Sequence, residues 1–194
     1  MLPREIIGQI ISIAAMGCNI LSYQNKNQKS LLLFQLLGGT LFAISFFLLG
    51  ATIGAILNLI AVVRAVMFLF SDKLKMSHPL WLAGFIAVYI TVYVLNFAVF
   101  GTEPRFINFA IEVLPVIGMT ALSVGFMFED SSKVRMLGLV SSPAWLIYNI
   151  YYLSVGAIVC ESLSLISIFI GMLRHDKKPA TDVTEDLAKD STEN

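Results

Sequence analysis

Residues 45–58 read SFFLLGATIGAILN, and they lie inside an apolar segment that runs almost without interruption from residue 31 to residue 70. A membrane core about 30 Å thick needs roughly 20 residues of helix, so this segment is too long for one crossing. The glycines within LLGATIG favour a tight turn between two helices. We therefore predict a helical hairpin, with one helix at about residues 31–49 and the other at about residues 52–71.

The composition of the whole chain supports a membrane location for these helices. Hydrophobic residues make up 57% of the 194 residues and charged residues only 13%, whereas about a quarter of an average soluble chain is charged. Cys18 and Cys160 lie in apolar runs, and His78 and His175 have no second ligand at a useful spacing, which predicts neither a disulfide nor a metal site. We expect an all-α integral membrane protein without a cofactor.

Further apolar segments bring the number of predicted spans to seven. Pro79 and Pro115 each suit the first turn of a helix. The first span could imitate a signal peptide, but Asn19 interrupts its apolar run and no convincing cleavage site follows. The predicted spans cover about residues 5–23, 31–49, 52–71, 79–100 and 111–129, and a second hairpin over residues 134–173 with its turn near residues 153–155.

If the chain has seven spans, nearly all Lys and Arg residues of the connecting segments and tail lie on one side of the membrane. One side holds only Arg4 and Arg105, and the other holds Lys26, Lys29, Lys73, Lys75, Lys133, Arg135, Arg174, Lys177, Lys178 and Lys189. Cytoplasmic loops carry the Lys/Arg excess, so we predict an outside N-terminus and an inside C-terminus. Six spans would scatter these charges over both sides. Residues from about 175 onward have no apolar face, which predicts a disordered cytoplasmic tail.

The two hairpins belong to an internal repeat. Ile7-Gly8 and Ile117-Gly118 each open a unit, and SFFLLGATIGAILN aligns loosely with YNIYYLSVGAIVCE through a shared Gly-Ala-Ile. Because the joining helix crosses once, both units run in the same direction, which predicts two parallel three-helix bundles joined by a linker helix, a 3+1+3 layout. The expected parts are a first unit at residues 1–73, a linker helix at 74–103, a second unit at 104–174 and the tail at 175–194.

This layout resembles the SWEET sugar transporters and the wider PQ-loop/MtN3 group, whose members pair two three-helix bundles. Gln24 lies where that group has its PQ turn, but Tyr23 stands in place of the proline. The chain is more similar to the bacterial inner-membrane family YgjV. That resemblance covers most of residues 5–174, implies a multi-pass inner-membrane protein and implies no particular substrate. It rests on FFLLG at 46–50, GAILN at 54–58 followed by Arg64, EVLPVIG at 112–118, and YN, GAI and ES within 148–162.

Polar side chains inside the predicted spans mark candidate sites, because such groups usually face a bundle interior or a wet cavity. On the repeat alignment, Asn58 matches Cys160, beside Glu161, and Ser45 matches Asn149. The resemblance to SWEET proteins implies that an asparagine on the third helix of each bundle lines the substrate pocket. Asn58 fills that place in the first unit, whereas Cys160 and Glu161 stand there in the second, a departure from the pattern of a sugar pocket.

Ser142, Trp145 and Asn149 recur at spacings of three and four residues and therefore share one helix face. An aromatic plane beside an amide could bind a sugar ring or a cation. Alternatively, Trp145 packs between helices while Asn149 hydrogen-bonds a neighbouring backbone.

Glu161 allows three interpretations. It could be a protonated structural acid, because burial favours the neutral carboxyl. It could pair with Arg64, the one basic residue within a predicted span, or it could line the solute pathway and bind a cation or carry a proton. The depths of the two residues permit the pair, but their facing disfavours it. Leu59 is the repeat partner of Glu161, and Arg64 lies about 140° around the helix from Leu59, at about 100° per residue.

The functional expectation is a SWEET-like transporter of an unknown small solute across the lipid bilayer. The sequence offers no nucleotide-binding glycine loop, nucleophile–base set or nucleic-acid-binding face, so we expect neither an enzyme nor a nucleic-acid partner. The alternative is a non-transporting membrane scaffold or sensor that uses its cytoplasmic loops and tail. Homo-oligomerisation is left open. The expected midplane pocket is formed by Asn58, Asn149, Trp145, Glu161 and Ser45.

Overall fold

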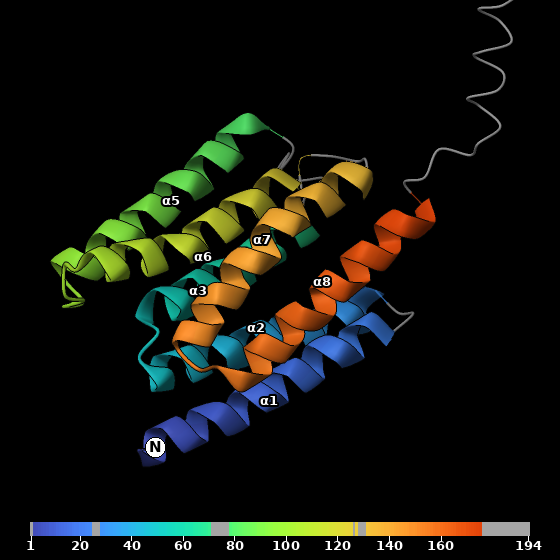
Figure 1. Cartoon of the computed structure of the whole chain (residues 1–194). Helices are drawn as coiled ribbons and strands as arrows, with labels where there is room; N and C mark the ends of the chain where they lie inside the picture. The colour runs from blue at the N-terminus through green and yellow to red at the C-terminus, as the bar shows by residue number, and fades with distance from the viewer. Residues whose placement is uncertain (1, 25–27, 71–77, 126, 128–130, 176–194) are drawn as a thin grey trace, which may run out of the picture.

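The computed structural model describes residues 2–24, 28–70, 78–125, 127 and 131–175, and seven α-helices make up most of them. The helices lie side by side with roughly aligned axes (Figure 1). This confirms the predicted all-α fold. The helices are α1 (Pro3–Gln24), α2 (Gln28–Leu49), α3 (Thr52–Leu69), α5 (Pro79–Ala98), α6 (Phe106–Gly125), α7 (Ser131–Tyr151) and α8 (Val155–His175).

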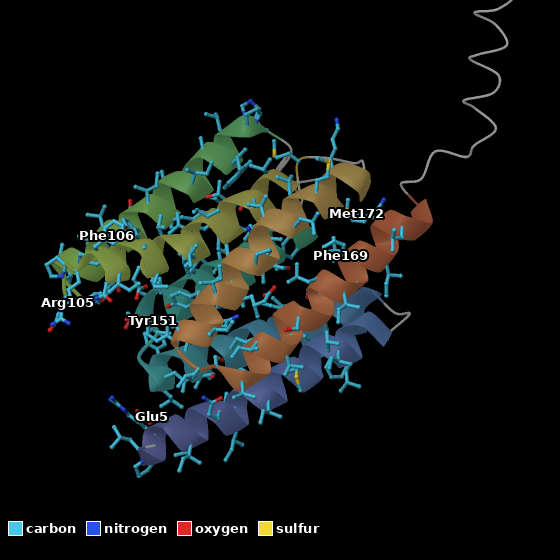
Figure 2. All side chains as sticks on the ribbon, in the orientation of Figure 1. Glu5, Arg105, Phe106, Tyr151, Phe169 and Met172 are labelled. Atoms are coloured by element: carbon cyan, nitrogen blue, oxygen red, sulfur yellow. The ribbon has the colours of Figure 1, made fainter. Side chains whose placement is uncertain are left out.

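Four helices contain a segment that is long and apolar enough to cross a membrane: Pro3–Leu21, Pro79–Ala98, Phe106–Gly125 and Val155–Leu173. Leu36–Leu49 and Thr52–Met67 are shorter apolar helical segments. Large apolar side chains stay exposed on the outer faces of the bundle, including Phe106 at 88% and Phe169 at 57% (Figure 2). Such faces match a surface that meets lipid rather than water.

Both predicted hairpin turns are confirmed. The turn between α2 and α3 contains Gly50, whose φ of 80° lies in the left-handed region where a residue without a Cβ is unstrained. The turn between α7 and α8 contains Leu153, which adopts a φ of 52° although it carries a side chain. Pro79 opens α5 as predicted, where the side chain of His78 accepts a hydrogen bond from the Leu80 N–H.

The predicted start of α6 is wrong. The helix begins at Phe106 rather than near residue 111, and the Phe109 N–H already donates to the Arg105 carbonyl at 3.0 Å. Pro115 therefore lies inside the helix, fully buried, rather than in its first turn. A proline can interrupt one backbone bond of a membrane helix when neighbouring helices pack around it, so packing overrides the local preference for the first turn.

The helices pack in a pattern that is the same for both hairpins. α1 packs on α2 and α2 on α3, while α6 packs on α7 and α7 on α8. Two further contacts, α1 with α8 and α3 with α6, join these groups, and α5 packs on α6 and α3. Exchanging α1 with α6, α2 with α7 and α3 with α8 therefore reproduces the main packing contacts that do not involve α5.

Two ends of the bundle are distinguished below. The end that carries the N-terminus and residues 50–51, 99–105 and 152–154 is called the turn end, and the end at which α8 stops is called the tail end (Figure 1). The predicted disordered tail beyond His175 and the predicted cationic loop positions Lys26, Lys73 and Lys75 lie outside the described residues.

Candidate functional site

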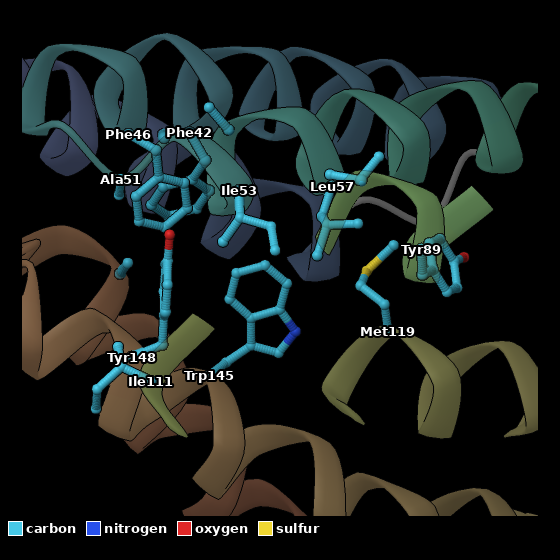
Figure 3. Packing of buried hydrophobic residues seen from close by; sticks show 14 residues of the cluster. Phe42, Phe46, Ala51, Ile53, Leu57, Tyr89, Ile111, Met119, Trp145 and Tyr148 are labelled. Carbon is cyan, nitrogen blue, oxygen red and sulfur yellow. The ribbon is translucent and has the colours of Figure 1, made fainter. Parts of the chain in front are cut away.

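A cavity of about 670 Å³ lies between helices of both hairpins. Its apolar wall includes the aromatic side chains of Phe42 and Phe46 on α2 and Trp145 on α7. Phe46 and Trp145 stack with their ring centroids 6.2 Å apart (Figure 3). Its polar lining comprises Asn19, Asn58, Arg64, Arg135, Ser141, Ser142, Asn149, Cys160, Glu161, Ser164 and Ser167.

The structure brings most of the predicted site residues together. Asn58, Trp145, Asn149 and Glu161 all line this cavity, together with Arg64. Ser45 does not belong to the lining, because its hydroxyl is fully buried between α1 and α2 and donates to the Gly8 carbonyl at 2.8 Å.

Glu161 is held on the cavity wall by α8. The Ser142 hydroxyl of α7 donates a hydrogen bond to its carboxyl group. On the same wall, the side-chain amide of Asn19 points its nitrogen at the Cys160 sulfur, 4.0 Å away. No cluster of three or more His, Cys, Asp or Glu side chains within the described ranges could hold a metal ion.

Arg64 is 5% exposed, and its guanidinium is hydrogen-bonded to neutral groups. Its Nη1 donates to the Ser123 hydroxyl at 2.5 Å, to the Tyr89 hydroxyl at 3.2 Å and, at 3.5 Å, to the Met119 carbonyl. These bonds tie α3 to α5 and α6. The predicted ion pair between Arg64 and Glu161 stays a prediction, because these anchoring bonds do not involve the carboxylate.

Asn149 is 1% exposed, and its side-chain oxygen has no hydrogen-bond partner among the described residues. Asn58 differs, because its amide nitrogen donates to the Gly54 carbonyl one turn earlier in α3, at 2.9 Å. Leaving a buried acceptor unpaired costs about 1–3 kcal/mol. Asn149 is therefore a described amide on the cavity whose buried oxygen is an unused hydrogen-bond acceptor.

The turn hydrogen bonds fix how the two hairpins correspond. In the first turn the Ala51 N–H donates to the Phe46 carbonyl at 2.8 Å, and in the second the Ser154 N–H donates to the Asn149 carbonyl at 2.9 Å. Gly50 and Leu153, each with positive φ, occupy the same place. The match of Asn58 with Cys160 is therefore wrong by one residue, because the shared Gly-Ala-Ile is shifted relative to the turns.

With the corrected register, corresponding residues of the two hairpins line the cavity together. Asn58 on α3 corresponds to Glu161 on α8. Ser45 corresponds to Tyr148 rather than to Asn149. The lining contains five such pairs: Phe42 with Trp145, Phe46 with Asn149, Asn58 with Glu161, Ala61 with Ser164, and Arg64 with Ser167.

Hydrogen bonds join α1 to the start of α8 at the turn end. The Gln9 side chain donates to the Leu153 carbonyl and accepts from the Val155 N–H at 3.0 Å. One turn further along α1, the Ser12 hydroxyl lies 3.0 Å from the Ser154 hydroxyl and accepts from the Ala157 N–H at 3.2 Å. Gln9 and Ser12 thus both use their side chains to bond α1 to the residues at the start of α8.

Two tyrosines of the second hairpin form further hydrogen bonds near this end. The Tyr148 hydroxyl accepts from the Gly54 N–H of α3 at 2.9 Å, and the Tyr152 hydroxyl donates to the Glu112 carboxyl of α6. Glu112 is 2% exposed, and its second oxygen has no partner among the described residues. Because α6 begins at Phe106, Glu112 lies inside the helix rather than at its end.

Sequence reasoning missed several lining residues. Ser164 and Ser167 follow Glu161 at spacings of three, so a polar stripe on one helix face could have revealed them. In the sequence, Arg135 contributes to the predicted excess of cytoplasmic Lys and Arg residues, and nothing there indicates that it lines a cavity. Phe42 and Phe46 carry no such signal, because aromatic residues in an apolar run look the same whether they face lipid, a core or a cavity.

The comparison with protein families gives a match over most of the chain. The family model of Imp-YgjV, described as bacterial inner membrane protein, matches residues 6–179. A search of curated proteins and a search of solved structures found no match. The matched range includes the entire cavity lining and all the described helices except the first three residues of α1. The chain therefore belongs to the Imp-YgjV family of bacterial inner membrane proteins.

Proposed function

We propose that this inner-membrane protein is a transporter or permease that moves a small solute through the cavity between its two hairpins. The observation that carries the proposal is the cavity itself, about 670 Å³ in volume and lined by charged and amide groups among helices whose outer faces are apolar. Polar groups are costly within a membrane, so their concentration around one cavity indicates a use for it. The volume falls within the usual range for small-molecule sites.

The proposed architecture is two parallel three-helix bundles, α1–α3 and α6–α8, with α5 as the linker helix. Three observations support it: the exchangeable contact pattern, the matching turn hydrogen bonds, and the five corresponding pairs on the cavity wall. A site at the interface of two such repeats is the usual arrangement in transporters built from parallel repeats. Alternating access would then be a rocking of one bundle against the other.

In the proposed orientation all seven helices cross the membrane, with the turn end outside and the tail end inside. The Lys/Arg distribution supports this orientation. The polar bonds of Gln9, Ser12, Tyr148 and Tyr152 lie at the turn end, whereas the lining continues to Arg135 and Ile168 toward the tail end. The described conformation then corresponds to a state closed to the outside.

The alternative, a membrane scaffold or sensor that does not transport, predicts a dry and closed bundle core. A polar cavity of this volume favours the transporter over that alternative. We further propose that the protein is not an enzyme, since the cavity wall offers a carboxyl, guanidinium groups, amides and hydroxyls without a described nucleophile–base pair.

Uptake of a panel of labelled solutes into proteoliposomes tests the proposal. At least one solute should enter faster than in protein-free liposomes, and Glu161→Gln and Asn58→Ala should each reduce that uptake at least about tenfold. Glu103→Gln and Asn108→Ala are matched controls, because both residues lie outside the cavity lining at the turn end. Uptake that is indifferent to both cavity variants would remove these residues from the mechanism, and a panel without any uptake would remove the transporter.

A further inference from the structure

The charged groups of the cavity have an order along the bundle that follows from helix register. The Gly54–Tyr148 hydrogen bond sets one level shared by the antiparallel helices α3 and α7. At about 1.5 Å per residue, Arg64 lies roughly 15 Å from that level toward the tail end. Glu161 is bonded to Ser142 of α7, which lies roughly 9 Å from it in the same direction.

By this register, the backbone of Arg64 lies about one helical turn from the level of Glu161, on the tail-end side. Arg135 also lines the cavity and lies about another 4–5 Å toward the tail end, by the register of α7. Asn149, whose side-chain oxygen lacks a partner among the described residues, lies at the opposite limit, beside Tyr148. The cavity wall is thus cationic toward the tail end and carries acceptor groups toward the turn end.

We infer that the cavity binds a small zwitterion, whose anionic group lies at Arg64 and whose ammonium group lies at Glu161 and points toward Asn149. This names the solute class of the proposed transporter and so rests on that proposal. Charged groups inside a membrane protein are stabilised by a partner of opposite sign, and a solute that carries both signs supplies both partners at once. An ammonium group can also donate the hydrogen bond that the Asn149 oxygen lacks.

The rest of the wall fits the apolar part of such a solute. Phe42, Phe46 and Trp145 form one aromatic side of the cavity, with successive ring centroids 6.2 Å apart. A neutral sugar would leave the charges of Arg64 and Glu161 without counter-charge from the solute, and a fatty acid would leave Glu161 and Asn149 without a donor. The order of groups therefore selects a zwitterion over these two classes.

Binding to the purified full-length protein tests the inference without relying on transport. The probe is a mixture of the twenty common L-amino acids, followed by its members singly, with thermal unfolding in detergent as the readout. A ligand that binds the folded protein raises its Tm. For the strongest member, the amide that lacks the carboxylate and the acid that lacks the amino group should each bind at least about tenfold more weakly. No rise in Tm with the mixture, or equal binding of either analogue, overturns the inference.

Two cavity variants identify which group meets which charge. Glu161→Gln should bind the intact amino acid and its des-amino analogue about equally, and Arg64→Gln should bind the amino acid and its amide about equally. Loss of these preferences is not expected from a purely structural change. Since Arg64 is buried in a hydrogen-bond network, Arg64→Lys serves as a second variant that keeps the charge and should keep the preference for a carboxylate. Arg105→Gln, at an exposed ion pair with Glu103, is the control and should bind as the natural sequence does.

The same panel separates the two proposals. Binding that follows this charge pattern supports the zwitterion, even if uptake into proteoliposomes then fails and removes the transporter. Uptake of a neutral solute with no binding of any amino acid supports transport and overturns the zwitterion.

Discussion

At Gly156, α1 and α8 approach so closely that one added carbon has no room. A Cβ there would meet the backbone carbonyl group and the hydroxyl of Ser12. Backbone atoms cannot swing aside as a side chain can. Small residues at such contacts let membrane helices pack backbone to backbone, which is a main source of stability where no hydrophobic effect drives association.

Gly156→Ala is therefore expected to push α8 away from α1 and to destabilise the protein by about 1–3 kcal/mol, the usual cost of overpacking. Gly17→Ala is the matched control, because nothing lies within 4 Å of a Cβ at that position of α1, and its effect should be neutral or stabilising by up to about 1 kcal/mol. Thermal unfolding of both variants in the same detergent measures the difference. Equal melting temperatures would contradict the close approach of the two helices.

Individual residues differ in how well the sequence reveals them. Glu161, Asn58 and Asn149 could be found because a polar group within an apolar run is costly unless it meets a polar environment. Ser45 gives the same signal, yet its hydroxyl is satisfied by the Gly8 carbonyl. Whether a polar side chain faces a cavity or bonds a neighbouring helix depends on helix rotation, which a single hydroxyl does not reveal.

At the scale of the helices, a part-buried hydrogen bond joins α6 to the turn that follows α7. The Tyr152 hydroxyl donates to a carboxyl oxygen of Glu112, whose other oxygen has no described partner. Tyr152→Phe should therefore lower stability by about 1–3 kcal/mol, because both carboxyl oxygens would then lack donors. Chemical or thermal unfolding measures the loss.

A double-mutant cycle with Glu112→Gln separates this bond from the packing of the ring. The coupling between positions 112 and 152 should lie within about 0.5–3 kcal/mol. Tyr151→Phe is the matched control, because Tyr151 is 46% exposed and its hydroxyl reaches only the side chain of Asn108. A coupling near zero would mean that Glu112 and Tyr152 do not stabilise the turn end together.

The helices themselves were largely predictable, and their limits less so. Gly50 marks the first turn in the sequence, whereas Leu153 adopts the same left-handed conformation without any such signal, and the prediction of its turn rests on the length of the apolar run at 134–173. The start of α6 was missed because Pro115 suggests a first turn, while the actual helix continues through it. Tertiary packing decided that boundary, and packing partners cannot be read from one segment.

For the whole molecule, the sequence repeat predicted the correspondence of the two hairpins to within one residue. A one-residue shift rotates a helix position by about 100°, enough to exchange Cys160 for Glu161 as the counterpart of Asn58. The Gly-Ala-Ile identity favoured the wrong register, and the turn hydrogen bonds correct it. The cavity could not be derived from either unit alone, because its wall combines residues from α1, α2, α3, α6, α7 and α8.

The two cysteines report on this cavity and on its proposed orientation at once. Cys160 lines the cavity and Cys18 does not. A charged, membrane-impermeant thiol reagent needs water and a thiolate, so it should label Cys160 at least about tenfold faster than Cys18 when each is the single remaining cysteine. Labelling should be faster from the cytoplasmic side. In the proposed orientation the turn end faces outside, and its polar contacts should block access of the reagent from there.

The measurement uses Cys18→Ser and Cys160→Ser in sealed right-side-out and inside-out vesicles. Gln9→Ala, which removes both bonds to the start of α8, should raise labelling of Cys160 from the outside and leave Cys18 unchanged. Equal rates for the two cysteines would mean that the cavity is closed to water, as the scaffold alternative predicts. Faster labelling from the outside would instead contradict the proposed orientation, because the turn end would then face the cytoplasm. It would still support a water-filled cavity.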